Sequence, residues 1–477
     1  MTSISVKKPL ILNGFAMDVV GHVSAGLWRH PKDQANRYTS LDYWVSLARI
    51  LEDGGFDGLF LADALGHLDV YGGTPAASLR TAAQSPVNDP LLLVSAMAAA
   101  TRHLGFGVTV STTYEQPYLL ARKFTTLDHL TNGRIAWNIV TSVLDSAAKN
   151  LGLEKQIDHD QRYDRAQEFV DVAYKLWEGS WDDDAVVRDK SRGVYTDPSR
   201  VRPIHHRGTY YNVPGAHLSA PSPQRTPLLY QAGASARGRE FAAQNAEVVF
   251  LGGTNAPAIR RAVEAVRSRA VAHGRAPEAI KFITGLTIVT ARTDAEAEAK
   301  YKEYLSYTSV EAALALFSAW TGVDWAKYPL DHPLEYIETN AIRSVLAGLT
   351  SIDADRRWTV ADIAEYIGVG GIHPTLVGGP KKVADELEAL ADESGVDGFN
   401  LAYAISPGTF EDFAEFVTPE LRRRGRIRER AETPVTLRER FQGIGQRGLR
   451  DDHRGAQFRR LGTPSFADIQ TANRAAS

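Results

Sequence analysis

The sequence contains no cysteine among its 477 residues. This absence excludes disulfides, zinc–thiolate sites, all-cysteine iron–sulfur clusters and a cysteine nucleophile. Long apolar runs are absent too, because no stretch approaches the ~18 residues that a membrane-spanning helix requires. The apolar run before Asn13 has only about three to four residues, too few for the core of a secretory signal. We therefore expect a soluble, cytoplasmic protein with no membrane partner.

An excess of charge of one sign is also missing. The sequence holds 54 Lys and Arg against 57 Asp and Glu, a formal net charge of −3. Nucleic-acid binders concentrate basic charge on one surface, so this balance argues against a nucleic-acid partner. Arginine is concentrated only after Arg422, where acidic residues interrupt it and only Phe441 and Phe458 could stack on bases. We expect residues 441–477 to form an extended, Arg-rich arm beside a main domain of residues 1–440.

Several motifs for catalysis and nucleotide binding are absent. No predicted strand is followed by G-x-G-x-x-G, and neither a phosphate loop nor a G-x-S-x-G elbow occurs. His205 and His206 are adjacent and no carboxylate lies at ligand spacing, so solvated loop histidines are the simpler interpretation. The sequence therefore predicts no metal site and no Rossmann-type nicotinamide site.

Short apolar runs alternate with amphipathic segments along the chain, a pattern typical of a parallel sheet built from βα units. Most runs are continuous rather than alternating, as expected for strands covered on both faces. The eight predicted strands are Pro9–Phe15, Phe56–Ala62, Leu104–Val110, Ile135–Val140, Pro227–Gln231, Glu247–Leu251, Ile280–Val289 and Val396–Ala402. Eight such units predict a (β/α)8 TIM barrel, whereas an open doubly wound sheet has no reason to stop at eight.

The chain is longer than the roughly 250 residues of a typical barrel, so the surplus must lie in insertions. Two are evident, at about 178–226 and 301–377, and we expect the second to act as a lid. The helices predicted from apolar periodicity are Leu41–Leu51, Pro90–Thr101, Leu119–Leu130, Tyr163–Trp177, Ala256–His273 and Lys381–Glu393.

Polar residues follow several of these runs, and barrels place functional groups at the C-terminal ends of their strands. Asp63 ends the second run, Thr109 lies at the end of the third, and Asn138 lies in the fourth. Each has an ordinary alternative, such as a loop cap for Asp63 or a β-branched strand residue for Thr109. Their common position favours a ligand site at this end of the barrel.

The segment after the fifth run suits a phosphate. It reads QAGASARGR from Gln231, a strand end, a turn of small residues and a helix start. Free backbone N–H groups there, with the Ser235 hydroxyl, would bind a phosphate monoester, and an ordinary glycine turn with Ser235 as N-cap is an equal alternative. His159 and Tyr163 are four residues apart and could reach an anion from one helix face, although a surface pair is the simpler interpretation.

Six segments of the sequence indicate a protein family. In chain order they are LNGFAMDVVGHVSAGLWRHP, FDGLFLAD, LGFGVTVSTTYEQPYLLARKFTTLDHLTNGRIAWNIVTS, HDQRYDRAQEFVDVAYKLWEGSWDDDA, PSPQRTPLLYQAGASARGREFAAQNAEVVF and GVDGFNL. Together they resemble the nitrilotriacetate, dibenzothiophene-sulfone and dimethyl sulfide monooxygenases, which are bacterial-luciferase-like flavin enzymes. The resemblance covers about Pro9 to Arg440. It implies a (β/α)8 barrel and a two-component system, in which a separate NAD(P)H:FMN oxidoreductase supplies reduced FMN (FMNH2).

The resemblance also implies roles for individual residues. Those that match FMN ligands of the family are Asp63, Thr109, His159, Tyr163 and Ser235. Asp63 and Thr109 would lie near the flavin ring with Asn138 beneath it, and the other three would hold the phosphate. Reduced FMN would react with O2 to give a C4a-peroxide or hydroperoxide, while the protein excludes water and places the substrate beside it.

Three further residues concern the substrate. His22 is a candidate hydrogen-bond partner of the peroxide or substrate, and Phe15 would line the pocket, with a structural histidine and a core phenylalanine as the alternatives. Related sulfone monooxygenases carry His where this chain has Trp320, which implies a more apolar pocket. The first loop is closer to the dimethyl sulfide branch, and no Arg/Lys cluster suits a tricarboxylate such as nitrilotriacetate.

These features predict an FMNH2-dependent monooxygenase that acts on a small apolar organosulfur compound or a halogenated aromatic, by oxygenation, oxidative cleavage or dehalogenation. By analogy with barrels of this kind, we expect a homodimer or a homotetramer. Two alternatives keep the same barrel: a deazaflavin-dependent hydride-transfer enzyme, and a non-catalytic flavin-binding protein.

Overall fold

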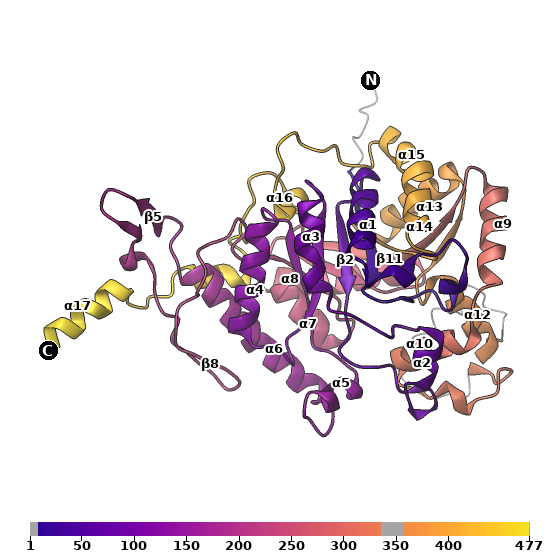
Figure 1. Cartoon of the computed structure of the whole chain (residues 1–477), viewed down its shortest axis with the longest axis horizontal. Helices are drawn as coiled ribbons and strands as arrows, with labels where there is room; N and C mark the ends of the chain where they lie inside the picture. Colours follow the sequence, from indigo (N-terminus) through magenta and orange to yellow (C-terminus); the bar gives the residue numbers. More distant parts are fainter. Residues whose placement is uncertain (1–7, 335–356, 477) are drawn as a thin grey trace.

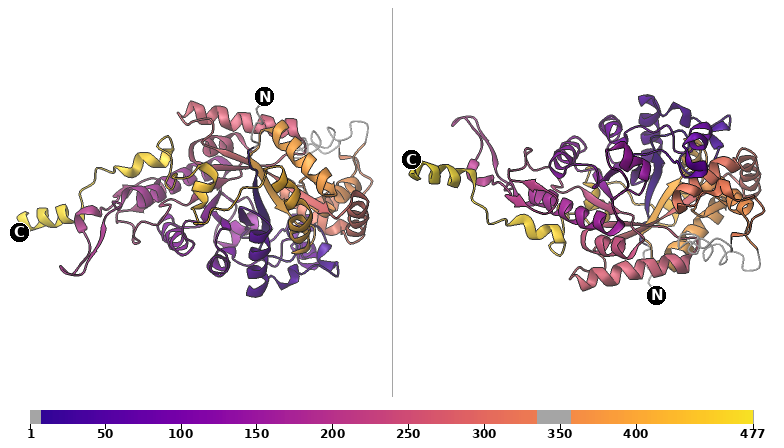
Figure 2. Two further views of the ribbon diagram at one scale, coloured as in Figure 1. Left: turned by 90° about the horizontal axis from the view of Figure 1, so that it is seen from above. Right: turned by 90° about the horizontal axis from the view of Figure 1, so that it is seen from below.

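The computed structural model describes residues 8–334 and 357–476. Eight parallel strands close into a barrel in the order β1-β2-β3-β4-β9-β10-β11-β13, and β13 pairs with β1 to complete the ring. Helices surround the strands on the outside (Figures 1 and 2). The structure therefore confirms the predicted (β/α)8 TIM barrel.

Each barrel strand overlaps one of the eight predicted runs. The strands are β1 (Ile11–Met17), β2 (Gly58–Ala62), β3 (Gly105–Ser111), β4 (Ile135–Val140), β9 (Leu228–Gln231), β10 (Val248–Leu251), β11 (Lys281–Thr290) and β13 (Gly398–Ala402). Nearly all their residues are buried, since helices cover one face and the barrel interior the other. A ninth strand, β12 (Thr375–Gly378), was not predicted and pairs with the far half of β11, beyond the stretch that pairs with β10.

The helices around the barrel and in its insertions are α1 (Leu41–Asp53), α2 (Ala76–Thr81), α3 (Val94–Ala99), α4 (Pro117–Leu130), α5 (Asp145–Asn150), α6 (His159–Tyr174), α7 (Ala236–Asn245), α8 (Ala256–Ala272), α9 (Asp294–Leu305), α10 (Val310–Thr321), α12 (Val360–Gly370), α13 (Pro380–Ser394), α14 (Gly408–Asp412), α15 (Thr418–Arg423), α16 (Leu437–Gln442) and α17 (Phe466–Ala476). In α1, Trp44, Leu47 and Leu51 are spaced three and four residues apart and form one buried face. Within the two described ranges, no helix is long and apolar enough to cross a bilayer.

The first insertion forms two small antiparallel hairpins, β5 (Val186–Asp189) with β6 (Val194–Thr196), and β7 (His206–Arg207) with β8 (Asn212–Val213). The β5–β6 hairpin and α17 lie at the same end of the molecule, away from the barrel (Figures 1 and 2). The Phe466 N–H donates to the Val201 carbonyl at 3.0 Å and so joins the start of α17 to this insertion.

The second insertion adds α10 and α12, which pack against each other beside α2. Their shared core includes Phe317, Trp325 and Trp358, and the rings of Phe317 and Trp325 stack at 4.9 Å. Residues 335–356 of the expected lid lie outside the described residues. In the described part, the insertion forms a second apolar cluster at the edge of the barrel rather than an open loop.

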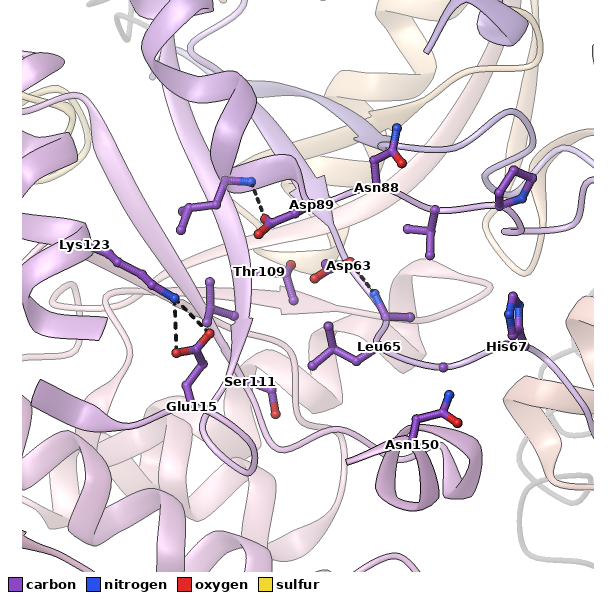
Figure 3. Close-up of a pocket in the computed structure, with 16 residues that line it drawn as sticks. Asp63, Leu65, His67, Asn88, Asp89, Thr109, Ser111, Glu115, Lys123 and Asn150 are labelled. Carbon is purple, nitrogen blue, oxygen red and sulfur yellow. Dashed lines mark hydrogen bonds and ion pairs between the residues drawn. The ribbon is translucent and has the colours of Figure 1, made fainter. Parts of the chain in front are cut away.

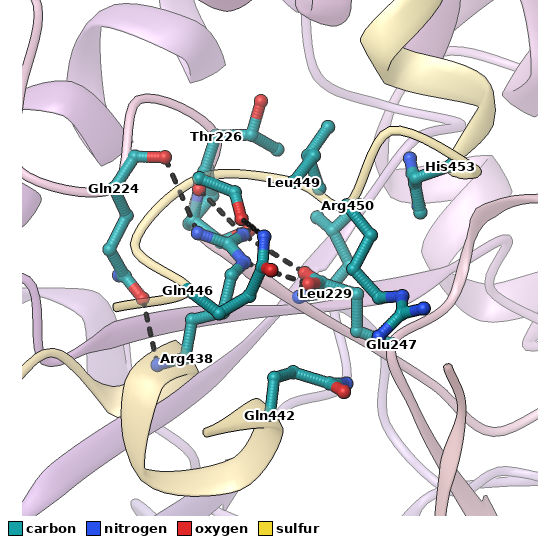
Figure 4. A network of polar contacts seen from close by, with 12 residues as sticks. Gln224, Thr226, Leu229, Glu247, Arg438, Gln442, Gln446, Leu449, Arg450 and His453 are labelled. Atoms are coloured by element: carbon teal, nitrogen blue, oxygen red, sulfur yellow. Dashed lines mark hydrogen bonds and ion pairs between the residues drawn. The ribbon is translucent and has the colours of Figure 1, made fainter. Parts of the chain in front are cut away.

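The segment around α16 packs against the N-terminal end of the barrel. A Cβ on Gly105, the first residue of β3, would lie 2.6 Å from Leu437, so the glycine allows this close approach. Phe441 is buried in the same cluster, and Arg438 forms a fully buried ion pair with Glu247 (Figure 4). The boundary expected between residues 440 and 441 thus falls inside α16, and part of the expected arm belongs to the body of the barrel.

Candidate active site

Two neighbouring cavities open at the C-terminal ends of β2, β3, β4 and β9. The larger measures ≈ 400 Å³ and includes Asp63 and Thr109, and the smaller measures ≈ 260 Å³ and includes Tyr163 and Gln231. Asp63 and Leu65 line both cavities, so the two lie on either side of the loop that follows β2. Figure 3 shows Asp63 and Thr109 side by side at the strand ends. Of the residues predicted from the sequence, Asp63, Thr109 and Tyr163 line these cavities, so the ends of β2 and β3 and the α6 helix meet in one crevice.

The pKa of the Asp63 carboxyl is strongly shifted by its surroundings in this crevice. Burial raises its pKa to about 7, the negative charges of Asp89 and Asp18 add to this effect, and a hydrogen bond from the Ala64 N–H opposes it. Burial together with Asp89 also raises the pKa of Asp18 to about 6. Asp63 is therefore held at the border between its neutral and ionised forms near neutral pH.

Thr109 and Asn138 are neighbours across β3 and β4, and Asn138 Nδ2 donates to Thr109 Oγ1 at 2.9 Å. Asn138 Oδ1 is buried and has no hydrogen-bond partner among the described residues. On the next strand, Gln231 Oε1 is buried and unpartnered in the same way. Two buried amide oxygens on adjacent strands thus lack donors, and Gln231 lines the smaller cavity, where a ligand would supply one.

Tyr163 and Ser235 also come together. Ser235 caps α7, where its Oγ accepts the Gly238 N–H at 2.9 Å, and Tyr163 hydrogen-bonds to Ser235. A Cβ on either Gly233 or Gly238 would lie 2.8 Å from the Tyr163 hydroxyl, so both glycines are needed for its position. The hydroxyl therefore lies directly at the N-terminus of α7.

His159 lies one turn before Tyr163 on α6, with 5.2 Å between the two ring centroids. Its side chain is largely exposed, and Nδ1 is 2.8 Å from Asp160 Oδ1. His159 is thus close to the Tyr163–Ser235 pair but is turned toward an acidic neighbour on the surface.

Phe15 and His22 form an aromatic wall on β1 and the loop that follows it, next to β2, and neither residue lines the two cavities. Their rings meet edge to face at 4.5 Å, and Phe15 also contacts Phe60 at 5.5 Å and Phe250 at 5.3 Å. Burial lowers the pKa of His22 to about 3, so its imidazole is neutral at physiological pH. Its Nδ1 has no partner among the described residues. The wall is therefore uncharged and mostly apolar.

Trp320 occupies the end of α10, near the first loop. A Cβ on Gly371 would lie 3.2 Å from the Trp320 ring and 3.1 Å from Val23, the residue that follows His22. Gly371 thus separates Trp320 from Val23 at the edge of the aromatic wall. Trp320 does not line either of the two cavities described above.

The structure also reveals site residues that the sequence analysis missed. Asp18 follows β1 as Asp63 follows β2, so its position at a strand end was a usable signal. His373 lies in the second insertion, yet its ring centroid is 6.0 Å from that of Phe15. No local sequence pattern predicts this contact. In residues 8–334 and 357–476, no group of three or more His, Asp or Glu side chains is arranged to hold a metal ion.

Comparison with known proteins agrees with this geometry. The luciferase-like monooxygenase family matches residues 22–398 of the chain. The chain belongs to the luciferase-like monooxygenase family. This confirms the family and the enzyme class predicted from the sequence.

Three relatives illustrate the relationship. The dimethyl-sulfide monooxygenase of Hyphomicrobium sulfonivorans is 52% identical over 97% of both chains, and the crystal structure of DmoA from that organism has a TM-score of 0.92 over 97% of this chain and 98% of its own. The long-chain alkane monooxygenase of Geobacillus thermodenitrificans is 49% identical over 95% of this chain and 99% of its own. The crystal structure of a riboflavin lyase with modified FMN and riboflavin is 39% identical, with a TM-score of 0.85 over 95% and 100%.

Proposed function

We propose that this luciferase-like monooxygenase binds reduced FMN across the two cavities and uses O2 to oxygenate a small apolar organosulfur compound. The observation that carries the proposal is the polar crevice described above, with the α7 N-terminus at one end and the aromatic wall on the neighbouring strand β1. The two cavities, of ≈ 400 and ≈ 260 Å³, have the size expected for a cofactor site.

The residues present fit FMN. The unpartnered oxygens of Asn138 and Gln231 suit the N–H groups of a flavin ring. The Ser235 and Tyr163 hydroxyls at the start of α7 suit a terminal phosphate, because backbone N–H groups and the helix dipole both favour an anion there. The riboflavin lyase structure, which contains modified FMN, supports flavin binding by this fold.

Reduced FMN, when bound, supplies the two electrons with which one oxygen atom of O2 enters the substrate while the other leaves as water. The chain then has three tasks. Asp63 and Thr109 orient the ring end, the aromatic wall around Phe15 keeps water away, and the neutral His22 offers a hydrogen bond without introducing a charge.

The wall also supports the choice of substrate. Phe15, Phe60 and Phe250 present aromatic surface without a charged group, which suits a thioether or sulfone better than an ionic compound. The relatives named for dimethyl sulfide and for long-chain alkanes point to small or apolar substrates as well. A halogenated aromatic would fit the same wall and is the alternative substrate class.

A separate NAD(P)H:FMN oxidoreductase would supply the reduced cofactor. The sequence has no dinucleotide-binding motif after a predicted strand, which supports a nicotinamide donor that binds to a separate protein. A relative that is 34% identical is named as component A of nitrilotriacetate monooxygenase, and its name indicates a second component.

Anaerobic titration with reduced FMN, followed by rapid mixing with oxygenated buffer, tests the proposal. We expect tight binding, reoxidation of the flavin more slowly than in free solution, and consumption of dialkyl sulfide with little hydrogen peroxide released. Binding with reoxidation at the rate of free flavin would favour a flavin-binding protein. Failure to bind FMN together with reduction of a deazaflavin would favour the hydride-transfer alternative.

A further inference from the structure

A second histidine, His373, enters the barrel mouth from outside the barrel strands. It follows the Gly370–Gly371 turn at the end of α12 and precedes β12. Its ring lies over Gly285 of β11, where an added Cβ would overlap the imidazole, with Cγ only 2.8 Å away. The missing side chain at Gly285 therefore makes the space that this ring occupies.

His373 completes the aromatic wall. Its ring centroid lies 6.0 Å from that of Phe15 and 5.9 Å from that of Phe250. It is also close enough to His22 to disfavour protonation of the His22 imidazole. The wall thus combines residues from β1, the first loop, β10 and the second insertion around one point.

The two histidines differ in what remains free on their rings. His22 is buried and hydrogen-bonds to the backbone of Phe15. His373 is only half-buried, as is the neighbouring Phe250, and neither of its ring nitrogens hydrogen-bonds to a residue in the described ranges. Burial lowers the pKa of His373 to about 4, so the ring is neutral and offers one N–H donor and one acceptor. A polar edge of this kind needs a partner from water or a ligand.

We infer that His373 is a specificity-determining residue whose ring N–H donates to the heteroatom of the bound substrate and so selects an organosulfur compound over a hydrocarbon of the same shape. The inference rests on the proposed oxygenation of an apolar substrate and adds the polar contact that such a pocket otherwise lacks. A pocket that supplies only aromatic surface discriminates weakly between isosteres, whereas an unmet hydrogen bond penalises the wrong substrate.

The test compares diethyl sulfide with n-pentane, in which a methylene replaces the sulfur. We expect the wild-type enzyme to favour the sulfide in kcat/KM. His373→Phe keeps a ring of similar shape over Gly285 but removes both nitrogens, so this preference should fall by about tenfold, the upper range for one neutral hydrogen bond. His373→Asn, which keeps a donor, should retain part of the preference.

Two further variants separate this role from a structural one. Gly285→Ala should displace the His373 ring by steric overlap and cause the same loss of preference without changing His373 itself. His103→Phe alters a half-buried histidine near the opposite end of the barrel and should leave the preference unchanged. The dissociation constant of reduced FMN should stay constant in all four variants.

An unchanged sulfide-to-pentane ratio in His373→Phe would overturn the inference, as would equal wild-type activity on both compounds. A parallel loss of FMN affinity would also overturn it, because the effect would then be structural. If the wild-type enzyme binds no reduced FMN or oxidises neither compound, the proposed function itself fails, and this outcome is visible before any variant is made.

Discussion

The buried ion pair between Arg438 and Glu247 provides the sharpest test of how the barrel is stabilised. Their side chains are 0% and 3% exposed, and two bonds of 2.7 and 2.9 Å join the guanidinium to the carboxylate. The guanidinium also donates to four main-chain carbonyls, those of Gln224, Thr226, Pro227 and Arg447. Arg438→Met removes all of these donors while keeping an unbranched apolar side chain.

The expected loss follows from what the substitution leaves behind. Two charged hydrogen bonds are worth roughly 1.5–3 kcal/mol each, and breaking one side of a buried ion pair typically destabilises by about 3–5 kcal/mol. Glu247 keeps one partner, the Leu229 N–H at 3.1 Å, which limits the penalty. We therefore expect Arg438→Met to lower the free energy of unfolding by about 3–5 kcal/mol.

Urea unfolding followed by circular dichroism measures this value. Adding Glu247→Leu to Arg438→Met should restore most of the stability, because an apolar pair can replace a buried ion pair at little net cost. Arg192→Met, which breaks an exposed pair with Asp189, is the matched control and should lose less than about 1 kcal/mol. A loss below 1 kcal/mol for Arg438→Met, or a double variant less stable than the single one, would refute the reasoning.

Three further predictions concern the crevice and the residues around it. Ser235→Ala should weaken reduced-FMN binding by about 1.5–3 kcal/mol in calorimetry but leave riboflavin binding unchanged, and equal effects on both would remove Ser235 from the phosphate site. Because the pKa of Asp63 is raised to about 7 in the folded protein, its contribution to the free energy of unfolding is complete below pH ~4 and is lost as the pH rises to ~7. The melting temperature of Asp63→Asn should therefore depend less on pH in this window, and identical slopes would contradict the burial argument. Trp320→His should change kcat/KM across a panel of sulfides and sulfones more than the dissociation constant of reduced FMN, and no change in either would place Trp320 outside the substrate site.

The barrel could be predicted from the sequence because its strands are covered on both faces. Such strands appear as continuous apolar runs, and all eight overlap a predicted run. β12 escaped prediction because its residues are few, mostly half-buried, and paired only with the far end of β11. α10 lies in the expected second insertion and was not predicted as a separate helix. Its apolar residues do not form a single face, because much of the helix is buried.

The same reasoning explains which residues at the barrel mouth could be predicted from the sequence and which could not. Asp63 and Thr109 stand at the ends of apolar runs, so their place at the barrel mouth follows from the fold. His373 reaches that mouth from a distant insertion, and only the empty space over Gly285 makes room for it. Arg438 lies in an arginine-rich stretch, and composition alone does not indicate which arginine is buried.

The pairing of β1 with β13 also determines when the protein can fold during its synthesis. Ile11 lies opposite Gly398, and Glu247 meets Arg438 still later in the chain. At about 5–20 residues per second, a ribosome would therefore present β1 without its final partner for tens of seconds. An unpaired strand edge readily joins strands of neighbouring chains. Efficient production of this barrel should thus depend on how well nascent chains are kept apart, and overexpression at lower temperature or with added chaperones should increase its yield.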